Sequence, residues 1–388
     1  MNEKIKLIYA MASPLTERWL SNFCLDELSG KFDLEYWDCS AFTRPSFGTH
    51  KVLSRPWVVV FKNISELAAR LATLPPDALR VFDIKRNFSN IAIHREFLKH
   101  SDLLIEIDCF GTRATIDSAR KRPPLIRRIF SKEQVAKLCE RPTRTLAHAF
   151  YAGKYIKYRL DSRSDHVSRK RFSRINHPDY ERYRKCLTET TPFAGMRYAV
   201  YIDNNFPRHT EIKLREPYLD TEAMAPKFYA SLNRFFDRIE KKYDCEVKIA
   251  GHPIANYGSN PFGGREIVYD KTVELVKDSL GVLIHTSNAF SYVVLFDKPV
   301  ALIYNAVYKT ARIEYGRLQG EAELLKLPLT NTDDDVPADG EVFSKLDAGI
   351  AADYKAKYLI ASPNETNAEL YAKYFREIYA AERVRRGV

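Results

Sequence analysis

Side chains that can bind a phosphate follow two apolar runs in the second half of the chain. His252 and Pro253 come directly after "VKIAG", and "HTSN" at 285–288 comes directly after "GVLI". An imidazole, hydroxyl groups and the free backbone N–H groups at a helix start all donate hydrogen bonds to phosphate. Pro253 would fix the backbone so that the His252 ring is presented to a ligand. We therefore predict a phosphate site formed by Gly251, His252, Pro253, His285, Thr286, Ser287 and Asn288.

Each of these two groups also has an ordinary structural interpretation. Ser287 or Asn288 could do no more than cap the helix that follows, and His252 could fill a strand end. The phosphate interpretation therefore requires both groups to lie at one end of one sheet. A second His-Pro, His177-Pro178, follows no apolar run, and we expect it at the surface.

Carboxylates that could act as a general base or a nucleophile also follow apolar runs. Asp203 follows "YAVYI" and opens a polar loop, and Asp108 ends "LLIEID". We take both as candidate catalytic residues, Asp203 first, although carboxylates at such positions also cap turns. Asp38 and Asp83 end strands of the same kind, and the sequence does not separate them from Asp108.

A further carboxylate, Glu274, lies in the first turn of a predicted helix, after a loop that contains Gly258, Gly263 and Gly264. It could accept hydrogen bonds from ribose hydroxyls, or could simply favour the helix dipole. The glycines would let the loop approach a nucleotide closely. No group of His, Asp and Glu has metal-ligand spacing, and no dinucleotide fingerprint G-x-G-x-x-G follows the predicted strands. We therefore expect neither a metal nor a cofactor.

Two series of alternating strands and helices position these residues. Apolar runs rich in β-branched residues alternate with helical spacing over residues 5–108 and again from about residue 196. This alternation is typical of a parallel sheet with helices on both faces, in which ligands bind beyond the carboxyl ends of the strands. A length of 388 residues fits two domains. We predict two Rossmann-like α/β domains that face a central cleft.

The predicted domain boundaries follow the composition. Residues 154–185 carry eleven Lys or Arg against four Asp or Glu, with few aliphatic residues, which favours a junction. We expect an N-terminal α/β domain at 1–153, a basic interdomain segment at 154–195 and a second α/β domain at 196–363. A C-terminal helix over 364–388 is expected to pack across the junction.

The formal net charge of +11 indicates a surface that attracts polyanions. The basic segment, which also carries tyrosines, fits an anionic membrane surface or a negatively charged glycan, and it has the composition of a nucleic-acid groove as well. Nucleic-acid binding without catalysis would leave both phosphate-binding groups unexplained, so we place it last. The sequence shows neither a membrane span nor a secretory signal. We expect a cytoplasmic protein that is at most peripheral at the inner face of the cell membrane.

Three stretches together resemble a known family: the His-Pro at 252–253, the hydroxyl-rich turn about thirty residues later, and the following "VVLFDKPVALIY". They are similar to the donor domain of bacterial GT-B glycosyltransferases that use CMP-activated sugars, namely the sialyltransferases and Kdo transferases of capsule and lipopolysaccharide assembly. The stretch "RYAVYIDNNFPRHTEI" resembles the opening strand and loop of the same domain. The resemblance covers residues 196–305, and the N-terminal half matches in architecture only.

This resemblance implies the transfer of a nonulosonic acid or Kdo from a CMP-activated donor to a cell-surface glycan or glycolipid. The first domain would bind the acceptor and the second the nucleotide donor. In the family the His-Pro histidine and the hydroxyl-rich turn contact the nucleotide phosphate, which implies that role for His252, Thr286 and Ser287. The two-carboxylate loop of several sialyltransferases is not evident in the first domain, which leaves the acceptor-side base open.

The same pattern also resembles teichoic-acid polymerases, which transfer glycerol phosphate or ribitol phosphate from CDP-alditols. Those enzymes usually carry an acidic residue before paired serines, whereas this chain has His285-Thr286-Ser287. We therefore place this interpretation second. Both interpretations share a cytidine nucleotide.

Overall fold

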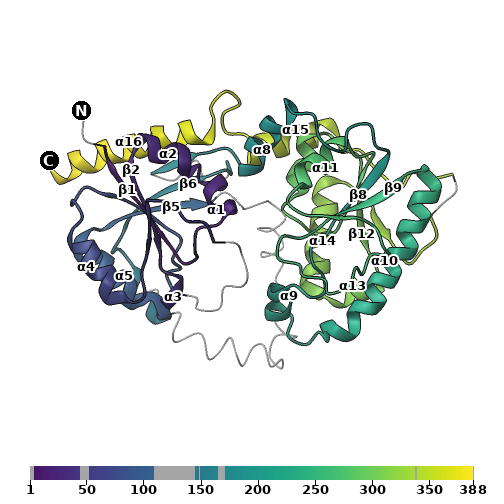
Figure 1. Cartoon of the computed structure of the whole chain (residues 1–388), viewed down its shortest axis with the longest axis horizontal. Coiled ribbons are helices and arrows are strands. Elements are labelled where there is room, and N and C mark those ends of the chain that lie inside the picture. Colours follow the sequence, from purple (N-terminus) through teal and green to yellow (C-terminus); the bar gives the residue numbers. More distant parts are fainter. Residues whose placement is uncertain are drawn as a thin grey trace. The chain divides into compact units, whose positions relative to one another are not determined.

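The computed structural model describes residues 4–43, 52–108, 145–147, 149–164, 171–336 and 339–387. These residues form two compact domains (Figure 1). The first domain contains the described residues up to Pro178 and those from Ala361 onward, and the second contains Asp179–Ile360. Within the described residues, the chain passes from the first domain to the second after Pro178 and returns at Ala361.

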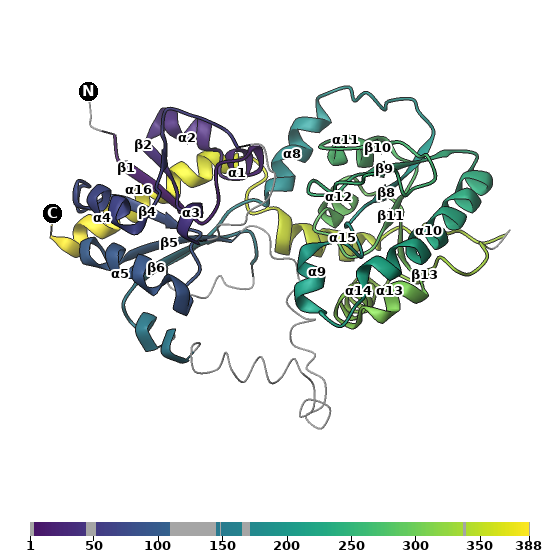
Figure 2. The same cartoon turned by 60° about the horizontal axis from the view of Figure 1, so that its bottom comes forward.

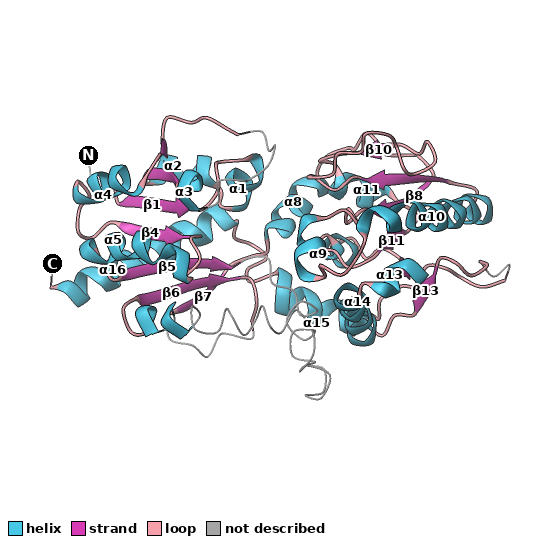
Figure 3. Cartoon of the chain, turned by 90° about the horizontal axis from the view of Figure 1, so that it is seen from below, coloured by secondary structure: helices cyan, strands magenta, loops and turns pink. Residues whose placement is uncertain are grey.

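The first domain is built on a seven-stranded sheet in the order β3-β2-β1-β4-β5-β6-β7. Its strand pairs are parallel, and Figure 3 shows the strands as arrows that point the same way. The strands are β1 (Lys6–Met11), β2 (Asp33–Asp38), β3 (Val58–Val60), β4 (Leu79–Phe82), β5 (Leu103–Asp108), β6 (Ile156–Asp161) and β7 (Phe172–Arg174).

Helices cover both faces of this first sheet (Figures 1 and 2). They include α1 (Glu17–Asn22), α2 (Leu25–Lys31), α3 (Ser40–Thr43), α4 (Ile64–Ala72), η1 (Phe88–Asn90), α5 (Ile91–His100) and α16 (Asn367–Arg386). Helices α4 and α5 lie on one face, and α2 and α16 lie on the other. The Phe375 ring of α16 packs edge-on against the rings of Tyr9 and Phe32, so that the C-terminal helix closes this side of the core.

The second domain is built on a six-stranded parallel sheet in the order β10-β9-β8-β11-β12-β13. The strands are β8 (Tyr198–Ile202), β9 (Glu246–Ala250), β10 (Ile267–Val268), β11 (Val282–Ile284), β12 (Val300–Tyr304) and β13 (Leu329–Asn331). The helices include α8 (Pro178–Leu187), α9 (Thr210–Arg215), α10 (Thr221–Tyr243), α11 (Thr272–Asp278), α12 (Phe290–Leu295), α13 (Ala306–Thr310), α14 (Arg312–Leu325), α15 (Ala348–Tyr354) and the π-helical turn Lys355–Leu359.

Helix α10 illustrates why these residues form these elements. The Asp220 carboxylate caps it by accepting a hydrogen bond of 3.1 Å from the Ala223 N–H. The residues that follow repeat apolar side chains at helical spacing, and these are buried in the core of the domain. They are Phe228, Leu232, Phe235, Phe236 and Ile239.

The sheet orders confirm the predicted fold class of two Rossmann-like α/β domains. In each sheet the first strand of the domain lies centrally, and later strands extend the sheet to either side. This is the doubly wound order, in which ligands bind at the point where the direction of extension reverses. This switch point lies between β1 and β4 in the first domain and between β8 and β11 in the second.

Two predicted boundaries need correction. Residues 156–161 and 172–174, expected in a separate basic segment over 154–195, form β6 and β7 of the first sheet. The boundary between the domains follows Pro178 instead. The C-terminal helix belongs to the first domain, where the Tyr371 hydroxyl donates a hydrogen bond of 3.2 Å to the Asn22 carbonyl.

Candidate functional site

Polar residues follow three neighbouring strands of the second sheet, two of which, β8 and β11, flank its switch point. Asp203 follows β8, Gly251 and His252 follow β9, and "HTSN" at 285–288 follows β11. Because parallel strands end at one edge of a sheet, these residues share the carboxyl edge. The structure thus gives the predicted second-domain residues the common edge that a joint site requires.

Asp203 holds the loop that carries His252. Its side chain is only 3% exposed. One carboxylate oxygen accepts hydrogen bonds from the His252 N–H (3.3 Å) and the Tyr257 hydroxyl (2.5 Å), and the other accepts from the Asn205 N–H (2.9 Å). Burial raises the pKa of Asp203 above its usual value, although these hydrogen bonds oppose the rise. With both oxygens engaged, Asp203 is built to position the loop.

The His252 side chain is half-buried and Pro253 is exposed, so both residues are accessible to a ligand. The His252 Nδ1 atom accepts a hydrogen bond of 3.3 Å from the Ile254 N–H. A neutral ring that accepts at Nδ1 carries its proton on Nε2, where it can be donated. Gly251 is needed for a different reason, since a Cβ there would lie 2.7 Å from the Tyr269 ring.

A second histidine, His209, lies against His252. The two rings are perpendicular, with centroids 5.1 Å apart. His209 belongs to the loop after β8, in which Asn205 has a positive φ of 55° and its carbonyl accepts a hydrogen bond of 2.8 Å from the His209 N–H. We predicted a polar loop here but no role for His209. A histidine in the loop beside a strand-end carboxylate was the available signal.

The residues after β11 divide between the core and the surface. His285 is 1% exposed, and the Tyr201 hydroxyl lies 3.3 Å from its Nδ1 atom. Burial lowers the pKa of His285 to about 3, so the ring is neutral. Its Nε2 atom has no hydrogen-bond partner among the described residues. His285 therefore packs among core rings, and the predicted phosphate contacts that reach the surface are Thr286, Ser287 and Asn288.

The turn at 286–288 differs from the expected helix cap. The N-cap of α12 is Ala289, which supplies no side-chain hydrogen bond. The Ser287 hydroxyl instead accepts a hydrogen bond of 3.2 Å from the Ala289 N–H. The Thr286 hydroxyl lies 3.1 Å from that of Tyr308 and 3.4 Å from a Glu314 oxygen.

Glu314 is the centre of a small ionic group beside this turn. Its carboxylate pairs with Arg215 at 2.7 Å and with Arg317 at 3.4 Å. Helix α14, which carries Glu314, starts against Glu216, whose carboxylate accepts a hydrogen bond of 2.9 Å from the Ile313 N–H. Thr286 therefore contacts an ion-pair network centred on Glu314, which the sequence pattern did not reveal.

His252 and Ser287 lie on either side of one strand. Because β8 separates β9 from β11, their strand axes are roughly 10 Å apart. The phosphate interpretation requires the two groups to lie at one end of one sheet, and the structure places them there with Asp203 between them. A ligand that contacts both groups must span the end of β8.

Glu274 lies in the first turn of α11, as predicted. One carboxylate oxygen accepts a hydrogen bond of 3.1 Å from the Lys271 ammonium. The other is buried and has no hydrogen-bond partner among the described residues. Such an atom can accept a hydrogen bond from a ligand hydroxyl, and the ribose contact remains a prediction.

The first-domain carboxylates, which the sequence left open, differ in their surroundings. Asp38 is buried and accepts a hydrogen bond of 2.9 Å from the Ser40 N–H. Asp108 pairs with Arg159 at 2.6 Å and Arg163 at 3.1 Å. Asp83 is exposed and follows β4, at the switch point of its sheet. Asp83 therefore has the better position for a base, and Asp108 is held in an ion-pair network.

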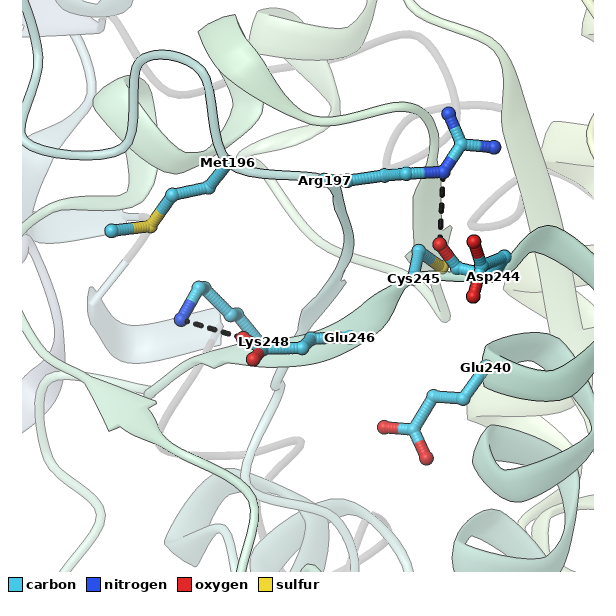
Figure 4. A pocket seen from close by; sticks show the side chains of 7 residues that line it. All are labelled: Met196, Arg197, Glu240, Asp244, Cys245, Glu246 and Lys248. Carbon is cyan, nitrogen blue, oxygen red and sulfur yellow. Dashed lines mark hydrogen bonds and ion pairs between the residues drawn. The ribbon is translucent and has the colours of Figure 1, made fainter.

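A hollow of about 560 Å³ lies at the other edge of the second sheet, where β8 and β9 begin (Figure 4). Its two basic side chains are bonded to their neighbours. Arg197 donates a hydrogen bond of 2.8 Å to the Asp244 carbonyl, and Lys248 lies 3.2 Å from a Glu246 oxygen. Because this edge carries the amino ends of the strands, we assign the hollow no role in the site.

Metal and membrane features can be stated for the described part of the chain. There, no group of three or more His, Cys, Asp or Glu side chains is placed to hold a metal ion. Metal independence stays a prediction. No helix within the described ranges is both long enough and apolar enough to cross a membrane. A second basic stretch of the sequence, "RKRPPLIRR" at 120–128, lies outside the described residues.

Comparison with known proteins adds similarities of fold. No protein-family model and no curated protein matches the chain. It is similar to the glycosyltransferase SnogD from Streptomyces nogalater at 13% identity and a TM-score of 0.43, over 97% of this chain and 100% of that chain. Spinosyn forosaminyltransferase SpnP is similar at 9% identity and a TM-score of 0.48, over 97% of this chain and 99% of that chain. UDP-N-acetylglucosamine 2-epimerase from Rickettsia bellii is similar at 10% identity and a TM-score of 0.44, over 98% of this chain and 97% of that chain. The activity has to be inferred from the residues of the site.

Proposed function

We propose that the chain is a glycosyltransferase that uses a CMP-activated sugar. The donor sugar is a nonulosonic acid or Kdo, and the acceptor is a cell-surface glycan or glycolipid. The second domain binds the donor, the first binds the acceptor, and the transfer needs no metal. The protein acts in the cytoplasm, at the inner face of the cell membrane.

The observation that carries this proposal is the attachment of the His252 loop to Asp203. Asp203, which follows β8, lies directly beside the switch point of the second sheet and accepts a hydrogen bond of 3.3 Å from the His252 N–H. A buried carboxylate that fixes a half-exposed histidine at this position supports a ligand site, because ligands of doubly wound sheets bind there. Asp203 is thus proposed as a positioning residue, whereas its role as a base remains a prediction from the sequence.

The donor phosphate is proposed to lie between the two groups of polar residues. His252 donates a hydrogen bond from Nε2, and Thr286 and Ser287 donate from the other side of β8. His209, whose ring centroid is 5.1 Å from that of His252, is added as a second imidazole at the phosphate. These donors stabilise the negative charge that appears on the phosphate as the sugar leaves.

The transfer itself needs a base on the acceptor side. The acceptor hydroxyl oxygen bonds to the anomeric carbon, the bond from that carbon to the phosphate oxygen breaks, and CMP leaves with the electron pair. The hydroxyl proton passes to a carboxylate. We propose Asp83 for this role because it is exposed at the switch point of the first sheet, with Asp108 as the alternative.

Thermal stabilisation by nucleotides tests this proposal. CMP is expected to raise the melting temperature of the wild type more than UDP, GDP or a single-stranded oligonucleotide does. His252→Ala should abolish the response to CMP, whereas His100→Ala, in the first domain, should keep it. Stabilisation by the oligonucleotide alone, unchanged by His252→Ala, would favour a nucleic-acid-binding protein and contradict the transferase.

Donor turnover separates the two cytidine-nucleotide interpretations. The protein is incubated with CMP-Kdo, CMP-sialic acid or CDP-glycerol in the presence of an acceptor extract, and the release of CMP is measured. Release from a CMP-activated sugar supports the proposal. Release from CDP-glycerol alone identifies an alditol-phosphate transferase instead.

Binding to a membrane surface is tested with lipid vesicles. The net charge of +11 supports binding to anionic lipid. The protein should sediment with vesicles that contain anionic lipid and not with neutral ones, and the bound fraction should fall as salt is added. Equal sedimentation with both kinds of vesicle would contradict an electrostatic contact.

A further inference from the structure

The chain enters the second domain at Asp179, the first residue of that domain after the crossing at Pro178. His177, just before the crossing, was expected at the surface but is 1% exposed. Asp179 is also buried, at 8% exposed. The second His-Pro of the sequence therefore marks a structural junction, and its residues are packed inside the protein.

The Asp179 carboxylate binds helix α12. One of its oxygens accepts a hydrogen bond from the Ser291 hydroxyl. The other accepts bonds of 2.9 Å from the Tyr292 hydroxyl and from the Arg182 guanidinium. Ser291 and Tyr292 lie in the first turn of α12 and are both buried. Buried bonds to a charged carboxylate are among the stronger hydrogen bonds in proteins, so α12 is firmly held at this end.

Helix α12 continues directly from the turn at 286–288. The Ser291 hydroxyl, which bonds Asp179, also lies 3.1 Å from the Asn288 carbonyl oxygen, and the Ser291 N–H donates to that oxygen at 3.3 Å. The Phe290 N–H donates to the Ser287 carbonyl at 3.2 Å. Two residues separate Ser287 from the helix start at Phe290. A displacement of Ser291 would therefore be passed to the turn.

The first-domain side of the same crossing is fixed as well. The Asn176 side-chain oxygen accepts hydrogen bonds from the backbone N–H groups of Ala361 (2.8 Å) and Ser362 (2.9 Å), where the chain returns to the first domain. The Asn367 amide bonds both the N–H and the carbonyl of Asn176, each at 2.9 Å. Only His177 and Pro178 lie between this fixed residue and Asp179.

We propose that Asp179 is a positioning residue for the donor phosphate. It holds Ser291, and through Ser291 it sets the shape of the turn that carries Thr286, Ser287 and Asn288. Because Asp179 is the first residue beyond the crossing, it also connects that turn to the point where the chain passes between the domains. This inference rests on the proposed function, since it takes the turn as a contact of the nucleotide phosphate.

The test uses Ser291→Ala and a matched control. Thr191→Val removes a bond of the same kind, from a buried hydroxyl to the Asp278 carboxylate at the end of α11, and neither partner is hydrogen-bonded to the turn at 286–288. Both variants should lose similar stability. The dissociation constant for CMP is measured by calorimetric titration at a temperature where every variant is folded. Ser291→Ala is expected to raise it roughly ten-fold, and Thr191→Val to leave it unchanged.

Asp179→Asn provides a second measurement of the same link. It keeps the shape of the side chain but removes the charge, and it should also raise the dissociation constant for CMP. A role limited to stability would lower the melting temperature of Ser291→Ala and Asp179→Asn without changing that constant, and this result would overturn the inference alone. Failure of the wild type to bind CMP would overturn the proposed function, and the inference with it.

Discussion

The Tyr257 hydroxyl donates a hydrogen bond of 2.5 Å to the Asp203 carboxylate. Asp203 directly follows a central strand of the second sheet, and Tyr257 lies in the loop after the neighbouring strand, so the bond joins the segments that follow two adjacent strands. Burial raises the pKa of Tyr257 above its usual value, and the charge of Asp203 adds to the rise. The phenol therefore keeps its proton at neutral pH and remains a donor to the carboxylate.

Removal of this bond should loosen the loop that carries His252. Tyr257→Phe leaves a buried carboxylate with one fewer donor, and we expect the free energy of unfolding to fall by about 1 to 3 kcal/mol. The dissociation constant for CMP should rise as well, because the loop loses one of its attachments. Chemical denaturation and calorimetric titration measure the two effects.

A matched control for this change is Tyr151→Phe in the first domain. There the tyrosine hydroxyl donates a hydrogen bond of 2.9 Å to the Asn87 carbonyl. The control should lose a little stability and bind CMP as the wild type does. If Tyr257→Phe bound CMP equally well, the attachment to Asp203 would be irrelevant to the site.

Gly251 is expected to tolerate no side chain without cost. A Cβ at this position would lie 2.7 Å from the Tyr269 ring and 2.9 Å from the Ile267 side chain, so these groups must move. Gly251→Ala should lower the free energy of unfolding by about 1 to 3 kcal/mol and weaken the binding of CMP. Gly258→Ala, in the same loop, meets no protein atom within 4 Å and should keep the wild-type free energy of unfolding. If Gly251→Ala kept both the wild-type free energy of unfolding and the wild-type affinity for CMP, the loop would accommodate the added methyl group without cost.

Because of Glu321, the free energy of unfolding should fall as the pH rises. Its side chain is buried in α14, and burial raises its pKa from 4.5 to about 8. Between these two values the folded state binds more protons than the unfolded state. The free energy of unfolding should therefore decrease over this window, by up to about 1.4 kcal/mol per pH unit from this group.

Replacement of Glu321 by glutamine checks this pH dependence. Glu321→Gln should match the wild type near pH 5 and be more stable near pH 8.5, in denaturation curves recorded at both values. The control Glu323→Gln changes an exposed residue two positions along the same helix and should keep the wild-type slope. An equal slope in all three proteins would mean that Glu321 stays ionised in the folded state.

Arg80 on β4 is expected to cost the first domain stability. Its side chain is 1% exposed, and its three guanidinium nitrogens have no hydrogen-bond partner among the described residues. Burial, together with the charge of Arg386, lowers its pKa to about 10. Arg80→Met keeps most of the volume and removes the buried charge, so the free energy of unfolding should rise by about 1 to 3 kcal/mol.

Arg386→Met is the contrasting variant for this prediction. The Arg386 guanidinium donates hydrogen bonds of 2.6 Å to the Pro76 carbonyl and 2.7 Å to the Ser101 hydroxyl. Its loss should destabilise the protein. A destabilised Arg80→Met would indicate instead that the buried guanidinium has an anionic or water partner in solution.

The apolar strands could be predicted from the sequence, whereas the charged ones could not. Runs such as "KLIYAM" at β1 are recognised as strands because they are short, apolar and contain β-branched and aromatic residues. The stretch "IKYRLD" at β6 carries charges at alternate positions, so we assigned it to a basic junction. In the structure Arg159 of β6 pairs with Asp108 on the neighbouring strand, at 2.6 Å. Such pairing depends on which strands become neighbours, and the local pattern does not contain that information.

The candidate site shows the same division. The strand ends at Asp203 and His252 follow from hydrophobic pattern and the rule for parallel sheets. The hydrophobic pattern does not show which of these side chains points toward the surface. His285 is buried in the core, where its ring packs against the rings of Tyr308 and Phe228. The pairing of His209 with His252 likewise arises from the path of a loop, which short-range spacing does not determine.

The position of α16 in the first domain has a consequence for the order of folding. Residues 361–387 complete a core that begins with β1, because Phe375 packs on Tyr9 and the Tyr379 hydroxyl bonds Asp77 at 2.7 Å. The second domain lies between these two parts of the chain. On the ribosome, the second domain can therefore reach its native state while the first still lacks one layer. We therefore expect the domain whose synthesis begins first to complete its fold last.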